Sequence, residues 1–132
     1  MSSKFSRLPD AELEIMKIVW KNGEECTSAV ICQELEGKKN WAVTTVLNFL
    51  ARLVDRGFLS VRKAGKTNIY KPLIEEDVYL ESESKSFLER LHGNSFRSLV
   101  ASLYGGEAIS REDLAELRSY IDEQSEQSGG AK

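Results

Sequence analysis

The chain has little of what several classes of protein require. It has two cysteines in 132 residues, Cys26 and Cys32, too few for a disulfide framework and at a spacing that fits no CxxC metal pair. The neighbouring acids do not suggest the electropositive setting of a redox cysteine. No apolar run approaches the roughly 18 residues of a membrane span, and the N-terminus has no apolar signal core. We therefore expect a cytoplasmic protein with reduced thiols, no metal and no membrane partner.

Sequence patterns of catalysis are also missing. His92 is the only histidine, and it has no serine or cysteine partner at a motif spacing. No HExxH, GxSxG, GxxxxGK[ST] or DxDxDG pattern occurs. The cluster of acids at residues 75–77 is most simply a favourable charge at a helix start. We predict that the chain is not an enzyme and has no catalytic residues and no cofactor.

Length and composition describe a globular protein whose charge is unevenly distributed. The 132 residues, 41% hydrophobic and 30% charged, suit one domain or a small domain with an appendage. The net charge of −3 hides a basic segment, because residues 37–71 hold eight basic side chains against Asp55 alone. Residues 1–36 have a net charge of −3 and residues 72–132 one of −7. Such segregation is typical of a chain in which one surface meets a polyanion.

One amphipathic segment lies within the basic region. In residues 41–57, WAVTTVLNFLARLVDRG, apolar side chains recur at i, i+3, i+4 and i+7: Val46, Phe49, Leu50 and Leu53. This spacing predicts a helix with one buried stripe. Gly57 is suited to end the helix, because glycine takes a left-handed conformation there without steric cost.

The opposite face of this helix is polar without being acidic. Its side chains can each donate a hydrogen bond to a base edge or a phosphate: Thr44, Thr45, Asn48 and Arg52. Short polar side chains let a helix axis approach its partner closely, so we expect this helix to lie in a groove. The alternative is an ordinary surface face of a core helix, because periodicity alone shows only that one face is buried.

The preceding segment predicts two shorter helices. Pro9 is placed to open the first, which Gly23 stops. Thr27 or Ser28 can cap the second, and residues 37–40 form the turn that follows it. This glycine-containing turn joins the second of these short helices to the helix of residues 41–57, which has the polar outer face. Two helices joined in this way form a helix-turn-helix, and the later of the two enters a major groove.

An extended pattern follows Gly57. Residues 58–63 (FLSVRK) and 68–73 (NIYKPL) alternate apolar and polar side chains around a turn at 64–67 (AGKT). This β-hairpin would be a wing that meets the sugar-phosphate backbone through its basic side chains: Arg62, Lys63 and Lys66. The alternative is a hairpin that is basic only for solubility, although helix face and wing agree in sign.

Three helices are predicted after the wing, near residues 75–92, 95–105 and 110–124. Their apolar side chains exceed what a small winged domain can cover: Phe87, Leu88, Leu91, Phe96, Leu99, Val100, Leu103, Leu114, Leu117 and Ile121. They are typical of half of a symmetric dimer interface, and the alternative is the core of a second, monomeric domain.

These patterns predict a mainly α fold with a small β-hairpin wing. We expect a winged helix-turn-helix DNA-binding domain at residues 1–73, a helical dimerisation domain at 74–124 and a disordered tail at 125–132. The first seven residues should be loose. An alternative function is a winged-helix protein-interaction adaptor without sequence-specific DNA binding. An acidic helix face or wing would favour the adaptor, and neither is acidic.

Four segments together resemble the BlaI/MecI/CopY family of penicillinase repressors: LPDAELEIMKIVW (8–20), TTVLNFLARLVDRGFL (44–59), IYKP (69–72) and SFLERLHGNSFRSLV (86–100). The similarity covers about residues 8–123. It is specific, because winged helices in general do not share the first and last of these segments. The resemblance implies a homodimeric bacterial transcriptional repressor that binds double-stranded DNA at a palindromic operator, in the promoter of a resistance or stress operon.

Carried across residue by residue, the resemblance also implies roles for single side chains. Base-reading positions correspond to Thr44, Thr45 and Asn48. Phosphate contacts correspond to Ser28, Arg52 and the basic side chains of the wing. Relatives can present a polar or basic side chain where this chain has Leu47, so the resemblance implies a different operator sequence.

Two departures from the family concern release from DNA. In the β-lactam-responsive members a protease cuts an Asn-Phe bond in the dimerisation domain, and Ser102-Leu103 stands at that place. In the copper-responsive members a cysteine-rich tail binds metal, and this tail has no cysteine. The sequence shows no other signal site, so an inactivating protease or another inducer is left open.

Overall fold

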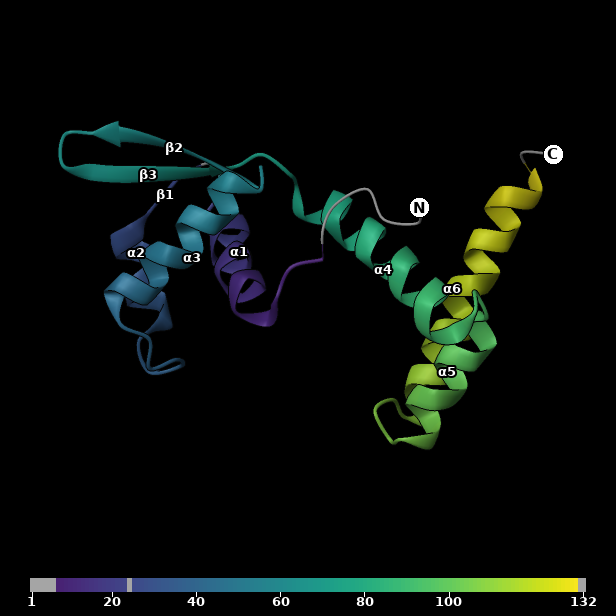
Figure 1. The fold of residues 1–132 in the computed structure, drawn as a ribbon. Helices are drawn as coiled ribbons and strands as arrows, with labels where there is room; N and C mark the ends of the chain where they lie inside the picture. The colour runs from purple at the N-terminus through teal and green to yellow at the C-terminus, as the bar shows by residue number, and fades with distance from the viewer. Residues whose placement is uncertain (1–6, 24, 131–132) are drawn as a thin grey trace. The chain divides into compact units, whose positions relative to one another are not determined.

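The computed structural model describes residues 7–23 and 25–130, which form two compact units, Met1–Ser86 and Phe87–Lys132 (Figure 1). The elements of the described residues are, in order, α1 (Asp10–Lys21), β1 (Cys26–Thr27), α2 (Ser28–Leu35), α3 (Val43–Asp55), β2 (Leu59–Ala64), β3 (Thr67–Pro72), α4 (Glu76–His92), α5 (Phe96–Gly105) and α6 (Arg111–Gly130). The predicted loose segment 1–7 lies outside the described residues except for Arg7.

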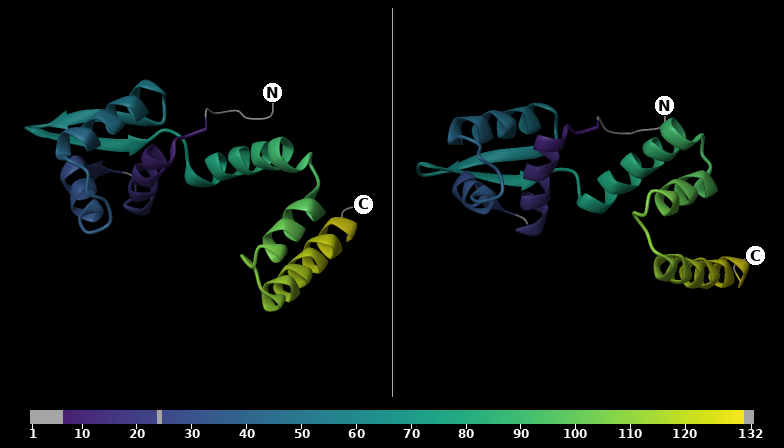
Figure 2. Two further views of the ribbon diagram at one scale, coloured as in Figure 1. Left: turned by 60° about the horizontal axis from the view of Figure 1, so that its bottom comes forward. Right: turned by 90° about the horizontal axis from the view of Figure 1, so that it is seen from below.

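The first unit contains a three-stranded antiparallel sheet in the order β1-β3-β2. The predicted hairpin is confirmed, with Leu59 opposite Pro72 and Ala64 opposite Thr67. The sequence did not predict β1, which pairs with the other edge of β3 and places Cys26 opposite Tyr70. In Figures 1 and 2 the hairpin tip extends beyond the three helices of this unit.

The helices α1, α2 and α3 enclose one apolar core with the sheet. Apolar side chains from every helix are buried, among them Ile15, Ile31 and Leu50, each with no exposed surface. The predicted stripe of α3 is largely confirmed, because Val46, Leu50 and Leu53 are buried while Phe49 is half-buried. Phe49 instead packs its ring against Trp41, with ring centroids 5.3 Å apart.

The helix α3 ends at a glycine cap that turns the chain into β2. Gly57 has φ +85°, and its N–H donates to the carbonyl of Val54 at 3.1 Å. The N–H of Phe58 donates to the carbonyl of Leu53 at 2.9 Å. These two bonds form a Schellman motif, which satisfies carbonyls at the helix end and requires a left-handed residue. The predicted stop at Gly57 is confirmed.

The start of α4 belongs to the first unit. The Tyr79 hydroxyl accepts a hydrogen bond from the Leu8 N–H at 2.9 Å, and the Trp20 indole donates to the Ile74 carbonyl at 2.9 Å. The Tyr79 ring is buried and lies edge-on to Phe58, with centroids 5.8 Å apart. The first unit therefore continues past the boundary expected at residue 73.

The second unit consists of the end of α4 with α5 and α6. Ser95 caps α5 by accepting from the Ser98 N–H at 3.0 Å. Ser110 and Asp113 cap α6 reciprocally through two bonds of 2.8 and 3.0 Å, which form a capping box. The helix α6 continues to Gly130, so residues 125–130 are helical where the sequence predicted a disordered tail. Extending an existing helix costs far less than starting one.

Candidate nucleic-acid interface

The outer face of α3 carries the predicted polar side chains in the open. Thr44, Asn48 and Arg52 follow one another at intervals of four residues and are exposed, while Thr45 is half-buried. Side chains four apart lie on one helix face, so the three exposed residues form a continuous row. This row can reach a partner without any rearrangement of the core.

The N-terminal end of α2 places Thr27 and Ser28 in different roles. The Thr27 hydroxyl accepts a hydrogen bond from the Val30 N–H at 3.2 Å, which selects Thr27 over Ser28 as the cap of α2. Ser28 is instead the first residue of α2 and is half-buried. Its position at a helix N-terminus suits a contact with an anion.

The wing presents two of its three predicted basic side chains freely. Lys63 and Lys66 are exposed, and Lys66 lies in the turn between β2 and β3. Arg62 is held by Glu25, whose Oε2 lies 2.7 Å from the guanidinium. The hydrogen bond and the charge of Arg62 hold the pKa of Glu25 below its usual value. Arg62 therefore has an intramolecular partner that a phosphate would have to replace.

A buried carboxylate lies behind the polar face, and sequence reasoning missed it. Glu12 of α1 is 1% exposed, and its Oε1 accepts no hydrogen bond from the described residues. Arg52 Nη1 lies 3.8 Å from Oε2 and Arg56 Nη1 lies 3.5 Å from Oε1. Glu12 thus pairs with Arg52 of α3 and with Arg56, the residue that caps the C-terminal end of α3. In the sequence it is one of several acids near a helix start, with nothing to mark its burial.

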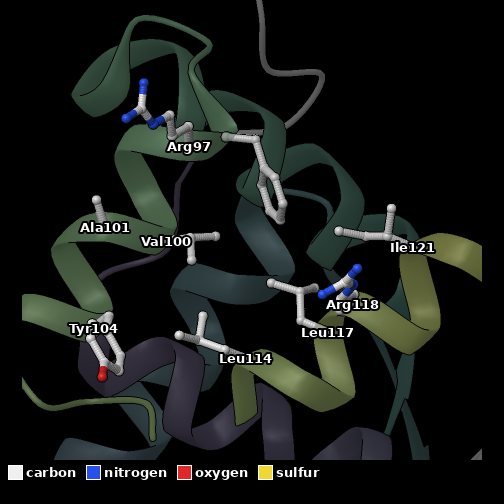
Figure 3. Close-up of a pocket in the computed structure, with 9 residues that line it drawn as sticks. Arg97, Val100, Ala101, Tyr104, Leu114, Leu117, Arg118 and Ile121 are labelled. Carbon is white, nitrogen blue, oxygen red and sulfur yellow. The ribbon is translucent and has the colours of Figure 1, made fainter. Parts of the chain in front are cut away.

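The second unit has an apolar groove between α5 and α6. No described residue after Tyr79 is buried, so the described part of the second unit has no buried side chain. The groove holds about 450 Å³ and includes five residues of the predicted dimerisation set: Phe96, Val100, Leu114, Leu117 and Ile121 (Figure 3). Tyr104 also lines it, eight residues after Phe96, a helical spacing that the sequence already contained.

The other predicted dimerisation residues lie outside this groove. Leu91 and Leu103 are exposed, while Phe87, Leu88 and Leu99 are half-buried. The bond between Ser102 and Leu103 lies inside α5.

Two further side chains, His92 and Cys26, provide no site of their own. The His92 Nδ1 lies 2.8 Å from the Ser98 hydroxyl, a contact that joins the end of α4 to α5. Cys26 is buried. Its burial, and to a smaller extent the charge of Glu34, raises the pKa of its thiol, which disfavours the reactive thiolate.

Among residues 7–23 and 25–130 no cluster of histidine, cysteine and acidic side chains could hold a metal. No helix of this described part combines the length and the apolar character needed to cross a membrane.

Comparison with known proteins identifies the family. A family model described as penicillinase repressor matches residues 8–123. The chain belongs to the penicillinase repressor family. Among curated relatives of this family, the penicillinase repressor of Bacillus licheniformis is 35% identical over 91% of this chain and 93% of its own length. The methicillin resistance regulatory protein MecI of Staphylococcus aureus is 29% identical over 92% of this chain and 98% of its own.

Two solved structures of a repressor of this family resemble the chain. The DNA binding domain of the repressor BlaI covers 58% of this chain and 93% of its own, at 34% identity and a TM-score of 0.51. The monomeric form of Bacillus licheniformis BlaI, in complex with the blaP half-operator, has the same coverage and identity and a TM-score of 0.50. The predicted fold class and family are confirmed. Membership of a repressor family also confirms that the chain is not an enzyme.

Proposed function

We propose that two copies of this chain form a transcriptional repressor that binds an inverted-repeat operator. One observation carries the proposal: the exposed polar row of α3 and the exposed lysines of the wing belong to the same unit of a penicillinase repressor family member. A helix with this face fits a major groove, and a basic hairpin beside it fits the adjacent backbone. In the cytoplasm, such a dimer would occlude polymerase at the promoter of a resistance or stress operon.

We assign two kinds of role to the side chains of the first unit. BlaI binds a half-operator as a monomeric form, so each protomer here would bind one half-site. Thr44, Thr45 and Asn48 would read bases, because short polar side chains on a groove-facing helix reach base edges. Ser28, Arg52 and the wing lysines would bind phosphates, which position the protein without reading sequence. Arg62 would join them once Glu25 releases it.

The second unit supports dimerisation. A unit whose described residues include no buried side chain has no core of its own, and burying apolar surface is the main source of folding free energy. A second copy packed in the α5–α6 groove would supply that core and relate the two winged helices by a two-fold axis. Dimers of helix-turn-helix proteins bind half-sites about one helical turn apart, or ~34 Å, and we expect that spacing here.

The test is binding of the purified protein to labelled duplexes. Inverted-repeat duplexes selected from a random pool would be compared with random DNA at two salt concentrations, with the mass of the free protein measured alongside. We expect a dimer that binds selected duplexes at least a thousandfold more tightly than random DNA. Weak binding that is equal on all sequences would contradict the proposal and favour a protein-interaction adaptor.

A further inference from the structure

The helix α3 presents an apolar row beside its polar row. Val43, Leu47 and Ala51 follow one another at intervals of four residues and are all exposed, like the polar residues that directly succeed each of them. Val43 is 59% exposed and Leu47 37%. A groove-facing surface of this kind therefore offers methyl groups as well as hydrogen-bond donors.

This apolar row is not part of the core. The buried stripe of α3 is formed by Val46, Leu50 and Leu53, none of which is more than 1% exposed. Leu47 lines a separate, open hollow of about 470 Å³ between α3 and the hairpin, opposite Val61. Leu47 is 37% exposed and Val61 43% exposed with the wing in place, so the wing leaves both side chains open to solvent. The row is therefore open to a partner from outside the unit.

The charges around the hollow indicate which occupant fits. Lys63 and Arg62 line its hairpin side, Arg62 being paired with Glu25, and Arg52 lies on the neighbouring row of α3. In residues 37–71 the only acid is Asp55, at the last turn of the helix. The occupant is therefore anionic at its edges and apolar where it meets Leu47. The major groove of DNA has this character at thymines, whose C5-methyl groups point into the groove between the phosphate strands.

We propose that Leu47 contacts the C5-methyl group of a thymine in each half-site and makes this repressor prefer thymine there. The inference rests on the proposed function, because it requires α3 to lie in the major groove. Burying one methyl group against an aliphatic side chain contributes a factor of about four in affinity. Sequence selection at that base pair would then depend on a methyl group and not on a hydrogen bond.

The experiment removes the methyl group alone. In the selected duplex each thymine of one half-site is replaced in turn by deoxyuridine, which keeps every hydrogen-bonding group. The unmodified protein should lose about fourfold in affinity at one position. Leu47→Ala should bind the thymine duplex about fourfold more weakly and should no longer distinguish thymine from deoxyuridine at that position.

A matched control separates this contact from a general loss of apolar surface. Leu73 is 58% exposed and lies outside α3, so Leu73→Ala should keep the full thymine preference. Thermal unfolding of both variants would show that the first unit stays folded, as expected for exposed positions. Selective binding with equal affinity for thymine and deoxyuridine at every position would overturn the role of Leu47 alone. A protein that selects no duplex would overturn the proposed function as well, and would assign the apolar row to an acidic protein partner.

Discussion

At the scale of single residues, the proposed interface assigns sequence reading and DNA-backbone binding to different side chains. Asn48 lies in the middle of the exposed row of α3, whereas Lys66 lies at the tip of the wing. An amide can pair with adenine in the major groove, and an ammonium group acts on phosphate as a point charge. Substitutions of these two residues should therefore affect DNA binding in different ways.

We predict that Asn48→Ala relaxes base preference at one position of each half-site, at a cost of about 1–3 kcal/mol on the preferred sequence. Lys66→Ala should weaken binding to all sequences alike. It should also reduce the slope of log affinity against log salt by about one unit, because one phosphate is no longer neutralised. Titrations of both variants on selected and random duplexes at several salt concentrations measure this. Equal losses on both kinds of DNA for Asn48→Ala would rule out its role as a base reader.

The buried Glu12 is the basis of a second prediction, which concerns the stability of the fold. Its carboxylate has two arginines as neighbours, so either Arg52→Ala or Arg56→Ala alone leaves one cation in place. Removing both leaves a buried charge unpaired, and the double variant should lose about 3 kcal/mol of unfolding free energy, more than the sum of the single losses. Adding Glu12→Gln should recover most of that loss, because it removes the charge. Denaturant titrations of the four variants give the coupling, and simple additivity would contradict it.

Residue patterns allowed the polar face to be predicted but not its electrostatic surroundings. Thr44, Asn48 and Arg52 follow from helical spacing alone, because the buried stripe fixes which face remains outside. The ion pairs of Arg62 with Glu25 and of Arg52 with Glu12 join residues 37 and 40 positions apart. Only packing brings such residues together.

At the scale of elements, the wing is restrained by its own ion pair. Glu25, just before β1, holds Arg62 of β2 at 2.7 Å. We predict that Glu25→Gln raises affinity for all DNA sequences alike, because it removes a competitor of phosphate and a negative charge near the backbone. Binding titrations against selected and random duplexes test this. Unchanged or lower affinity would mean that Arg62 does not contact phosphate.

The same pair gives a direction for the dependence on pH. The folded pKa of Glu25 is lowered, so its contribution to stability is present above the unfolded pKa and is lost as pH falls through the folded value. The ion pair therefore persists at neutral pH. In the acidic range its protonation should weaken the hold of Glu25 on Arg62.

The junction between α3 and the wing depends on the backbone of Gly57. Its φ of +85° disfavours any side chain, although no atom lies within 4 Å of an added Cβ. We predict that Gly57→Ala lowers the free energy of unfolding by about 1–2 kcal/mol through backbone strain alone. Gly57→Asn should cost less, since asparagine tolerates the left-handed region. Urea titrations compare the two, and an equal cost would indicate a packing defect.

Elements with a periodic pattern could be predicted, whereas short or solvent-exposed ones could not. The stripe of α3 and the alternation in β2 and β3 both reflect burial on one face. The strand β1 has only two residues, too few to show alternation, and it forms because Cys26 pairs with Tyr70 far along the chain. The extension of α6 to Gly130 follows no apolar pattern either.

At the scale of the whole molecule, the proposed dimer depends on the groove of the second unit. Ile121 lines the groove and is 42% exposed, while the adjacent Tyr120 is 59% exposed and does not line it. We predict that Ile121→Glu yields a monomer at micromolar concentration, because a carboxylate cannot be buried there without a partner. Tyr120→Glu is the matched control and should stay dimeric. Sedimentation or light scattering measures both masses, and a dimeric Ile121→Glu would place the interface elsewhere.

The charge distribution along the sequence indicated the separation of α3 and the wing from the C-terminal helices more clearly than any single motif did. The basic segment 37–71 contains α3 and the wing, whereas the acidic segment 72–132 contains α4, α5 and α6. Composition could not show that the described part of the second unit lacks buried side chains. Burial depends on which faces meet, and an amphipathic stripe suits a monomeric core and a dimer equally.

In the proposed dimer the second unit gains a core only when a second copy binds, so folding of this unit would depend on the concentration of the protein. By mass action, the concentration of assembled repressor rises with the square of the chain concentration while single chains predominate. Occupancy of the operator would then depend steeply on the chain concentration, and a twofold fall in that concentration would remove about three quarters of the assembled protein. An inducer of the proposed repressor would need only to separate or deplete the dimer and would not have to contact α3.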